Sequence, residues 1–444
     1  MRKLLTLVLI VAAAIHIQAQ EGTAVVLLNY ETLKKKVEKS DADIQNPKKN
    51  VKAATWVKRG ELFQDVFNMG LEQASEGMDA TTLKLFYKEP KGIETQTSED
   101  GEQIEIYKYD HMSYTFVNGV LQSWEKLDPF HPAPLEEAIA SYKKALEVEP
   151  GKMDSKVKEN LTELKAQLKR QGVNNYYSED YDGALKDFEN VLDVNKLDIF
   201  EGEMDTVMVQ YAGIIAREIA GKTDNKDLFR KSIGYYEQLA QAGFGGPNTF
   251  LQINMDYKSL GDTVKALETL MEAYKQYPDT VNVIANIADT YVTMKKVDEG
   301  IEFMEKAIAG NPDIAEVYYW NGRLLINKDE VEYVDKAIES YKKAGEMKPE
   351  LYYVWYDLGY IYYLQGADFY DRANTEEHEA TRDKLLELGK EKYNEAIPTL
   401  EKAYDLNDQN SDVKYETLDL LQRIYYKEQM MDDYNRVKDL KAGM

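Results

Sequence analysis

The feature that most constrains this chain is a pattern of residue types that returns at a nearly constant interval. Pro278, Pro312 and Pro349 end similar stretches and are separated by 34 and 37 residues. Within each interval, small and large apolar residues recur at spacings of three and four, which places them on one face of a helix. Since proline ends a helix, each interval is expected to hold a pair of helices. Such a pair leaves an apolar face that only the next pair can cover, so the pattern predicts a stack of repeats.

The same pattern extends toward both ends of the chain. One first helix carries Trp56, Gly60 and Phe63 at spacings of four and three, but its second helix follows only near Ala138 and Tyr142. Small residues at these positions let two helices approach, and large residues fill the gap beside them. Key positions of the other units are held by Gly172, Ala184, Phe188, Gly213, Tyr236, Ala288, Met304, Gly322 and Tyr341.

A segment of different texture, residues 68–134, interrupts the first unit. Its stretches LKLFY, EQIEIYKY, MSYTFV and VLQSWE alternate apolar and polar residues or are rich in aromatic and β-branched ones, which is typical of strands. Asn118 and Gly119 between the last two stretches form a strong hairpin signal. We expect these four stretches to be the strands of a small β-meander; irregular helices are the alternative.

The stretch LYYVWYDLGYIYYL, residues 351–364, carries two aromatic surfaces on one expected helix. One face holds Trp355, Leu358, Gly359 and Tyr362. The other holds Tyr353, Tyr356, Tyr360 and Tyr363. The repeat pattern accounts for the first face only. A charged segment at residues 368–393 also has the pattern of a helix, and it either leaves the tyrosines open to a partner or folds back and covers them.

Charge and leader composition indicate where the chain works. The formal net charge of −24 disfavours nucleic acid and anionic membrane surfaces as partners. Residues 1–19 combine a basic start, a short apolar core and a small-residue exit, which predicts a cleavable signal peptide and a periplasmic or secreted protein; an uncleaved anchor is the alternative. There is no cysteine, hence no lipoprotein signal and no disulfide. No later run is long enough to insert the mature chain into a membrane.

The sequence offers little for catalysis. After the leader, the histidines are His111, His131 and His378. His378 begins a resemblance to a zinc-protease helix, but Arg382 stands where the second histidine would be, so the metal would lack a ligand. The glycine-rich stretch GFGGPN lacks the lysine of a phosphate loop. We therefore expect no enzyme activity, no cofactor and no bound metal.

Taken together, these residues resemble the tetratricopeptide repeat (TPR) family. The TWVKRG opening, the KVKENLTEL helix and the late AIPTLEKAYDLN segment are more narrowly similar to exported TPR proteins of Bacteroidota-type bacteria. The resemblance implies a mostly α protein, a right-handed helical solenoid carrying the small β-meander near its N-terminus. It also implies that the protein holds other proteins and catalyses no reaction.

In TPR domains the first helices of successive units line the concave face. Carried over to this chain, the resemblance implies a tyrosine-rich concave groove of partner-binding residues: Asn282, Asp289, Tyr319, Arg323, Tyr353, Tyr356, Tyr360 and Tyr363. The expected function is a non-catalytic periplasmic or secreted interaction scaffold that binds a peptide or helix of an envelope protein. Glycan or peptidoglycan binding is the alternative, since aromatic side chains also stack on sugars. In a third possibility, the β-meander is the recognition module.

The expected organisation follows from these stretches in chain order. It comprises a signal peptide (1–19), N-terminal helices including the first helix of the split unit (20–67), the β-meander (68–134), the main TPR array (135–350), a TPR unit with a helical insertion at 368–393 (351–409), and C-terminal TPR or capping helices (410–444).

Overall fold

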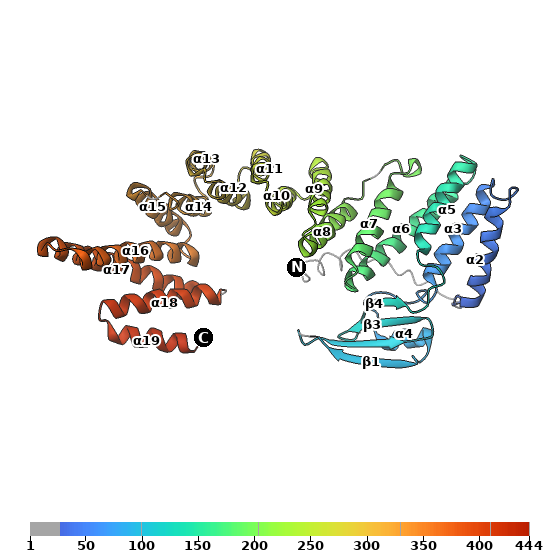
Figure 1. The fold of residues 1–444 in the computed structure, drawn as a ribbon, viewed down its shortest axis with the longest axis horizontal. Helices are drawn as coiled ribbons and strands as arrows, with labels where there is room; N and C mark the ends of the chain where they lie inside the picture. Colours follow the sequence, from blue (N-terminus) through green and yellow to red (C-terminus); the bar gives the residue numbers. More distant parts are fainter. Residues whose placement is uncertain (1–26, 99, 203, 329, 409, 444) are drawn as a thin grey trace. The chain divides into compact units, whose positions relative to one another are not determined.

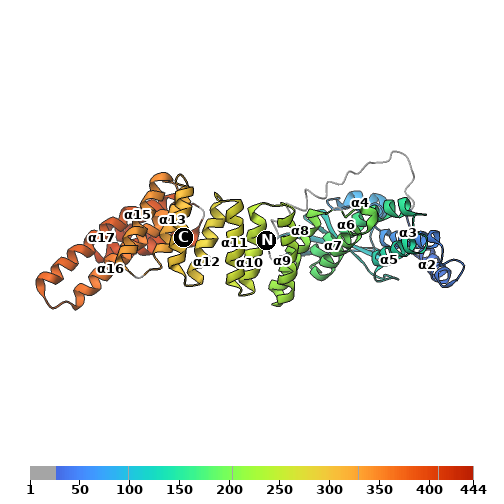
Figure 2. The ribbon, with the colours of Figure 1, turned by 90° about the horizontal axis from the view of Figure 1, so that it is seen from above.

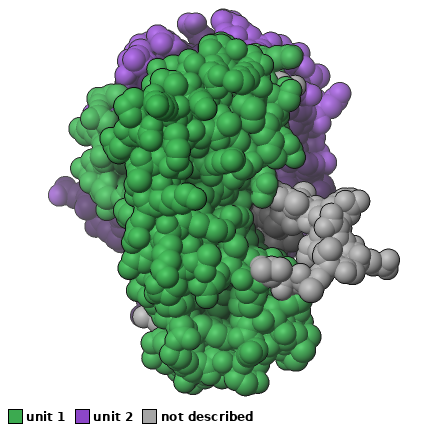
Figure 3. All heavy atoms as spheres, turned by 90° about the vertical axis from the view of Figure 1, so that its right-hand side faces the viewer, with its two compact units in different colours: residues 1–244 green, residues 245–444 purple. Residues whose placement is uncertain are grey.

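The computed structural model describes residues 27–98, 100–202, 204–328, 330–408 and 410–443. The predicted signal peptide lies outside these residues. The chain divides into two compact units, residues 1–244 and 245–444 (Figure 3).

Unit 1 combines helix pairs with one small sheet (Figure 1). Its described elements are α2 (Tyr30–Gln45), α3 (Ala53–Asn68), α4 (Ala80–Tyr87), β1 (Gly92–Thr97), β2 (Gln103–Lys108), β3 (Met112–Val117), β4 (Val120–Lys126), α5 (Pro134–Val148), α6 (Asp154–Tyr177), α7 (Tyr181–Asn195), a 3-10 turn (Asp198–Phe200), α8 (Thr206–Thr223) and α9 (Lys226–Gln241).

The regular elements described in unit 2 are all helices. Its elements are α10 (Pro247–Ser259), α11 (Thr263–Gln276), α12 (Val281–Thr293), α13 (Val297–Gly310), α14 (Ala315–Leu325), α15 (Val331–Met347), α16 (Tyr352–Thr375), α17 (Glu379–Leu406), α18 (Ser411–Lys427) and α19 (Met431–Ala442). The predicted fold class, a TPR-like helical stack with a small β-meander, is confirmed. None of the described helices of either unit is long and apolar enough to cross a bilayer.

The helices of a pair approach each other where a glycine meets a large ring. In unit 1, a methyl group added to Gly60 of α3 would lie 2.5 Å from the ring of Tyr142 on α5. Gly172 of α6 stands in the same relation to Phe188 of α7, again at 2.5 Å. Both rings are almost fully buried. Helices α3 and α5 therefore pack as a pair although α4 and the whole sheet lie between them in the sequence.

The sheet is an antiparallel meander in the order β1-β2-β3-β4. Asn118 and Gly119 join β3 to β4 with φ of 51° and 83°, the left-handed conformation that a tight hairpin turn between these strands needs. Three of the expected strands, β2, β3 and β4, form where the sequence indicates them.

The fourth expected strand was wrong. LKLFY, residues 83–87, is the end of helix α4. Asp79 caps this helix by accepting a hydrogen bond from the backbone N–H of Thr82 at 2.8 Å, and the only fully buried residue of α4 is Leu83. The remaining strand, β1, is GIETQT, whose six residues are all exposed. An exposed strand has no apolar alternation, so the pattern used to find the others missed it.

The helical insertion at residues 368–393 also differs from expectation. It does not form a separate helix that folds over its neighbours. Instead it lengthens both members of one hairpin, so that α16 runs to Thr375 and α17 starts at Glu379 (Figure 2). The two helices come close where Gly366 and Gly389 face each other. A Cβ atom added to Gly366 would lie 3.2 Å from the carbonyl oxygen of Gly389, and one added to Gly389 would lie 3.3 Å from that of Gly366.

Candidate functional site

The candidate site is built on α16 of unit 2. Its first aromatic face packs as the repeat pattern requires. The Trp355 ring lies against Gly345 of α15, its indole N–H donates to the Pro349 carbonyl at 2.8 Å, and Gly359 abuts Leu400 of α17. Tyr362 is only 3% exposed. These residues hold α16 in the stack.

The second face, which we call the tyrosine face, consists of Tyr353, Tyr356, Tyr360 and Tyr363. The rings of Tyr356 and Tyr360 are stacked with centroids 6.3 Å apart and planes 6° apart, and those of Tyr360 and Tyr363 with 6.5 Å and 19°. Tyr360 is 41% exposed and the other three are half-buried. The face is thus an ordered row of rings that keeps part of its area open.

Side chains of α18 lie at the hydroxyl groups of two tyrosines in this row. Tyr356 donates to Glu416 of α18 at 2.9 Å. Burial, together with this carboxylate, raises the pKa of Tyr356 above its ordinary value, so the phenol stays neutral. Arg423 of α18 is within hydrogen-bonding reach of Tyr363 and also binds Asp419 at 2.7 Å. The row is therefore anchored at two points on α18.

A ring contact joins the insertion to one end of the tyrosine face. Its residue Tyr393 stacks on Tyr363, with centroids 5.8 Å apart and planes 10° apart. Beyond that contact the added turns of α16 and α17 pack on each other, with Gly366 against the Tyr393 ring. Tyr360 remains the most open member of the row.

Tyr319 and Arg323 of α14 lie next to this face. The Tyr319 ring is 4.6 Å from that of Tyr353 but only 6% exposed, so it supports the row from beneath. Arg323 is exposed, and one of its guanidinium N–H groups donates to the Tyr319 hydroxyl at 3.4 Å. Arg323 thus supplies a cation at the edge of the row.

Sequence reasoning missed Asp357 at this place. Burial raises the pKa of its carboxyl, while the Arg323 cation and a hydrogen bond from Tyr319 act in the opposite direction. The available signal was its position on α16, four residues after Tyr353 and three before Tyr360, which puts an acid into the aromatic row.

Asn282 and Asp289 of α12 are exposed. The Asn282 carbonyl accepts a hydrogen bond from the Asn286 side chain of the same helix at 2.8 Å, and Asp289 pairs with Lys258 of α10 at 2.9 Å. Asn282 is thus bonded within α12, and Asp289 connects α12 to α10. The tyrosine face, Tyr319 and Arg323 are brought together by direct contacts, and these two residues are not part of that cluster.

The described residues contain no group of three or more His, Cys, Asp or Glu side chains that could hold a metal ion. His378 is the N-terminal cap residue of α17, and Arg382 follows within the helix.

The family model of the tetratricopeptide repeat matches residues 281–314, which contain α12 and α13. Curated proteins give no match.

The solved structures that this chain matches include three bacterial TPR proteins. The C-terminal part of a TPR repeat-containing protein from Cytophaga hutchinsonii is 16% identical, with 62% of this chain and 94% of that one covered and a TM-score of 0.39. A TPR repeats protein from Bacteroides fragilis is 18% identical, with 58% and 97% covered and a TM-score of 0.30. A thermophilic TPR protein from Thermus thermophilus is 17% identical, with 44% and 89% covered and a TM-score of 0.31.

The family match agrees with the repeat predicted from the proline spacing: residues 281–314 match the model of the tetratricopeptide repeat.

Proposed function

We propose that this protein is a non-catalytic scaffold of the bacterial periplasm that binds a segment of an envelope protein on the tyrosine face of unit 2. The tetratricopeptide repeat suggests a protein–protein interaction scaffold. The cellular compartment is proposed from the leader-like residues 1–19, and secretion beyond the periplasm is the alternative.

The observation that carries the proposal is the partly open, stacked row formed by Tyr356, Tyr360 and Tyr363. Tyrosine provides a large contact area at low entropic cost, because it has few rotatable bonds. Here the cost is lowered further, since Glu416 already holds one hydroxyl and Tyr393 already stacks on the end of the row. A partner would meet a surface that needs little reordering.

The chemistry of the row indicates the kind of segment it fits. The ring faces suit apolar or aromatic side chains of a peptide or helix, and the exposed Arg323 at the edge suits an acidic side chain or a carbonyl group. A partner that places an apolar residue on Tyr360 and an acceptor near Arg323 would use both features.

Site-specific photo-crosslinking tests the proposal in cells. Benzoylphenylalanine replaces Tyr360 in one strain and Tyr426 in a second strain; Tyr426 is 66% exposed on α18 and serves as the matched control. We expect a protein crosslink, identified by mass spectrometry, from position 360 and none of the same mass from position 426.

Purified protein then tests the residues against that partner. Tyr360→Ala should weaken binding roughly thirtyfold or more, as expected for an interface hot spot, whereas Tyr426→Ala should leave it unchanged. Equal crosslinking at both positions, or full affinity of Tyr360→Ala, would refute the tyrosine face as the binding surface. Binding of a glycan array that depends on Tyr360 would replace the protein partner with a glycan.

A further inference from the structure

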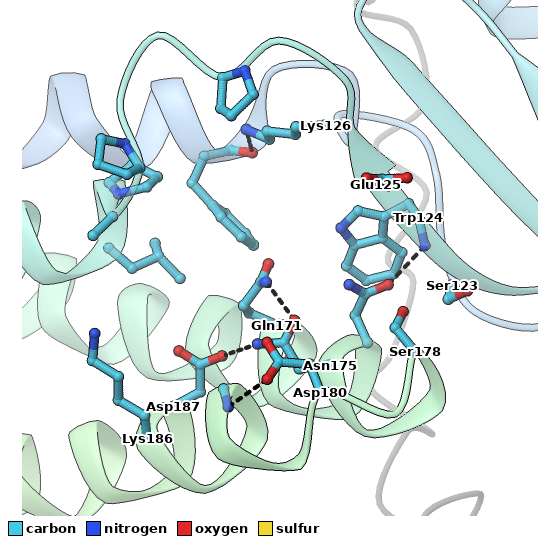
Figure 4. A pocket seen from close by; sticks show the side chains of 18 of the residues that line it. Ser123, Trp124, Glu125, Lys126, Gln171, Asn175, Ser178, Asp180, Lys186 and Asp187 are labelled. Carbon is cyan, nitrogen blue, oxygen red and sulfur yellow. Dashed lines mark hydrogen bonds between the residues drawn. The ribbon is translucent and has the colours of Figure 1, made fainter.

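Unit 1 contains a cavity of about 690 Å³ that the tyrosine face does not involve (Figure 4). Its walls come from three places: the sheet, the proline-rich connection that leads into α5, and the corner between α6 and α7. The volume lies within the range of about 300–1,000 Å³ that small-molecule sites occupy.

The sheet contributes hydroxyl groups to this cavity. Thr115 pairs with Ser123 across β3 and β4, and Ser113 pairs with Glu125, so the three hydroxyl residues share one face of the sheet. Ser113 is 5% and Ser123 9% exposed. Within the described part of the chain, no hydrogen bond joins these three hydroxyls to another protein group. These hydroxyls line the cavity and can both donate to and accept from a ligand in it.

The α6–α7 corner adds an ordered chain of amide and carboxyl groups, visible as dashed lines in Figure 4. The Gln171 amide donates to Asn175 at 2.9 Å, and Asn175 donates to one carboxyl oxygen of Asp187, also at 2.9 Å. Asp187 is 8% exposed. Burial, reinforced by the nearby Glu136, raises its pKa to about 8. At neutral pH its carboxyl is therefore protonated and can donate a hydrogen bond from its second oxygen.

Most of the charged groups that line the cavity are compensated within the protein; Glu125, which also lines it, is the exception among those described. Lys186 pairs with Glu136 at 2.5 Å. The Lys126 ammonium donates to the carbonyls at the end of α3, at 2.6 and 2.7 Å. Asp180 accepts from the backbone N–H of Gly183 at 2.9 Å, as the cap of α7. What remains for a ligand is mainly a set of neutral donors and acceptors.

We propose that this cavity binds a neutral, polyhydroxylated small molecule of the size of a mono- or disaccharide. Such a ligand offers many hydroxyl groups, each able to donate and accept, which match the serine and threonine hydroxyls of the sheet and the amide and carboxyl groups of the α6–α7 corner. Its less polar ring faces match the prolines of the connection into α5 and the Leu135 side chain at the start of α5. A cationic ligand fits less well, because the carboxylates of Glu136 and Asp180 are already engaged.

Isothermal titration calorimetry on the purified protein tests this site. The panel consists of glucose, galactose, mannose, N-acetylglucosamine, maltose, cellobiose, lactose and sucrose, with putrescine, choline and glucosamine as cationic probes. We expect at least one neutral sugar to bind with a Kd of roughly 1 mM or lower, and the cations to bind more weakly. Absence of binding by all eight neutral sugars would overturn the proposal.

Three variants connect binding to the cavity. Thr115→Val combined with Ser123→Ala should reduce sugar affinity about tenfold or more, because two ligand hydrogen bonds are lost. If the double variant unfolds, the same loss of sugar affinity is measured with Thr115→Val alone. Thr95→Val, on the exposed strand β1, is the matched control and should bind normally.

Asp187→Asn separates the two ligand classes. The amide keeps a neutral donor at this position, so a neutral sugar should bind within roughly threefold of the parent affinity. Unchanged affinity of Thr115→Val with Ser123→Ala would contradict the proposed site. Stronger binding of a cationic probe, abolished by Asp187→Asn, would show that the cavity is a cation site instead.

Discussion

Replacing Gly60 by alanine tests the packing that joins α3 to α5. The added methyl group would lie 2.5 Å from two ring carbons of Tyr142, whereas carbon atoms in favourable contact are about 3.5–4.0 Å apart. The ring cannot easily withdraw, since Tyr142 is fully buried and its hydroxyl donates to Gln64 of α3. The methyl group must therefore displace the ring or separate the two helices.

Two opposing effects set the magnitude. In an open helix interior, changing Gly to Ala stabilises by up to about 1 kcal/mol. Overpacking a well-filled core costs about 1–3 kcal/mol, and loss of the Gln64 hydrogen bond costs about 1 kcal/mol more. We expect Gly60→Ala to lower the free energy of unfolding of the region by about 1–4 kcal/mol.

Gly234→Ala, within α9 of the same unit, is the matched control. A methyl group there meets nothing within 4 Å. The same chemical change should therefore stabilise α9, by up to about 1 kcal/mol. The two variants are predicted to shift stability in opposite directions.

Hydrogen–deuterium exchange with peptide resolution measures both effects locally, and thermal unfolding followed by circular dichroism gives their overall sign. Exchange should become faster in α3 and α5 for Gly60→Ala and slower in α9 for Gly234→Ala. Tyr142→Leu removes the ring that the added methyl group meets. The double variant should therefore be more stable than the sum of the two single changes predicts, by about 1 kcal/mol. A Gly60→Ala protein as stable as the Gly234→Ala protein would show that the reasoning is wrong.

Three further predictions concern other parts of the chain. Leu400→Ala should lower the free energy of unfolding by about 2–5 kcal/mol in urea denaturation, because this side chain is fully buried against Gly359. Gly119→Ala should cost about 1 kcal/mol in the same assay, because φ is 83° at this hairpin position. Asp187 has a pKa raised from 3.8 to about 8 by burial, so the native state holds a proton that the unfolded state releases, and stability should fall as pH rises from about 4 to 8. Asp187→Asn should flatten this decline when unfolding is measured at pH 5 and pH 8.

Much of the helical architecture could be predicted from the sequence, because each helix carries its own periodicity. The small residue Gly60 and the aromatic Tyr142 were recognised as members of one pair although a whole sheet separates them in sequence. LKLFY was assigned wrongly, since five residues of alternating pattern fit a strand and a short helix equally well. The Asp79 side chain caps the N-terminus of α4 and so favours the helix over the strand.

The candidate site was only partly predictable. Helical spacing identified the tyrosine face on α16, but it could not show that Tyr319 is buried beneath Tyr353 or that Asp357 lies beside Arg323. Those facts depend on the packing of α14 against α16. The cavity of unit 1 had no sequence signal, because its walls come from the sheet, a connection and a helix corner that are far apart in the chain.

By itself, the sequence determined which residues share a helix face and that neighbouring pairs must stack to cover their apolar surfaces. These properties are local, since they follow from a period of 3.6 residues and from the backbone preferences of glycine and proline. Only the tertiary structure decided which tyrosines stay open, that the insertion lengthens α16 and α17, and that the sheet hydroxyls and Asp187 line one cavity. Exposure and pKa depend on groups brought close by packing, and a linear pattern does not contain those distances.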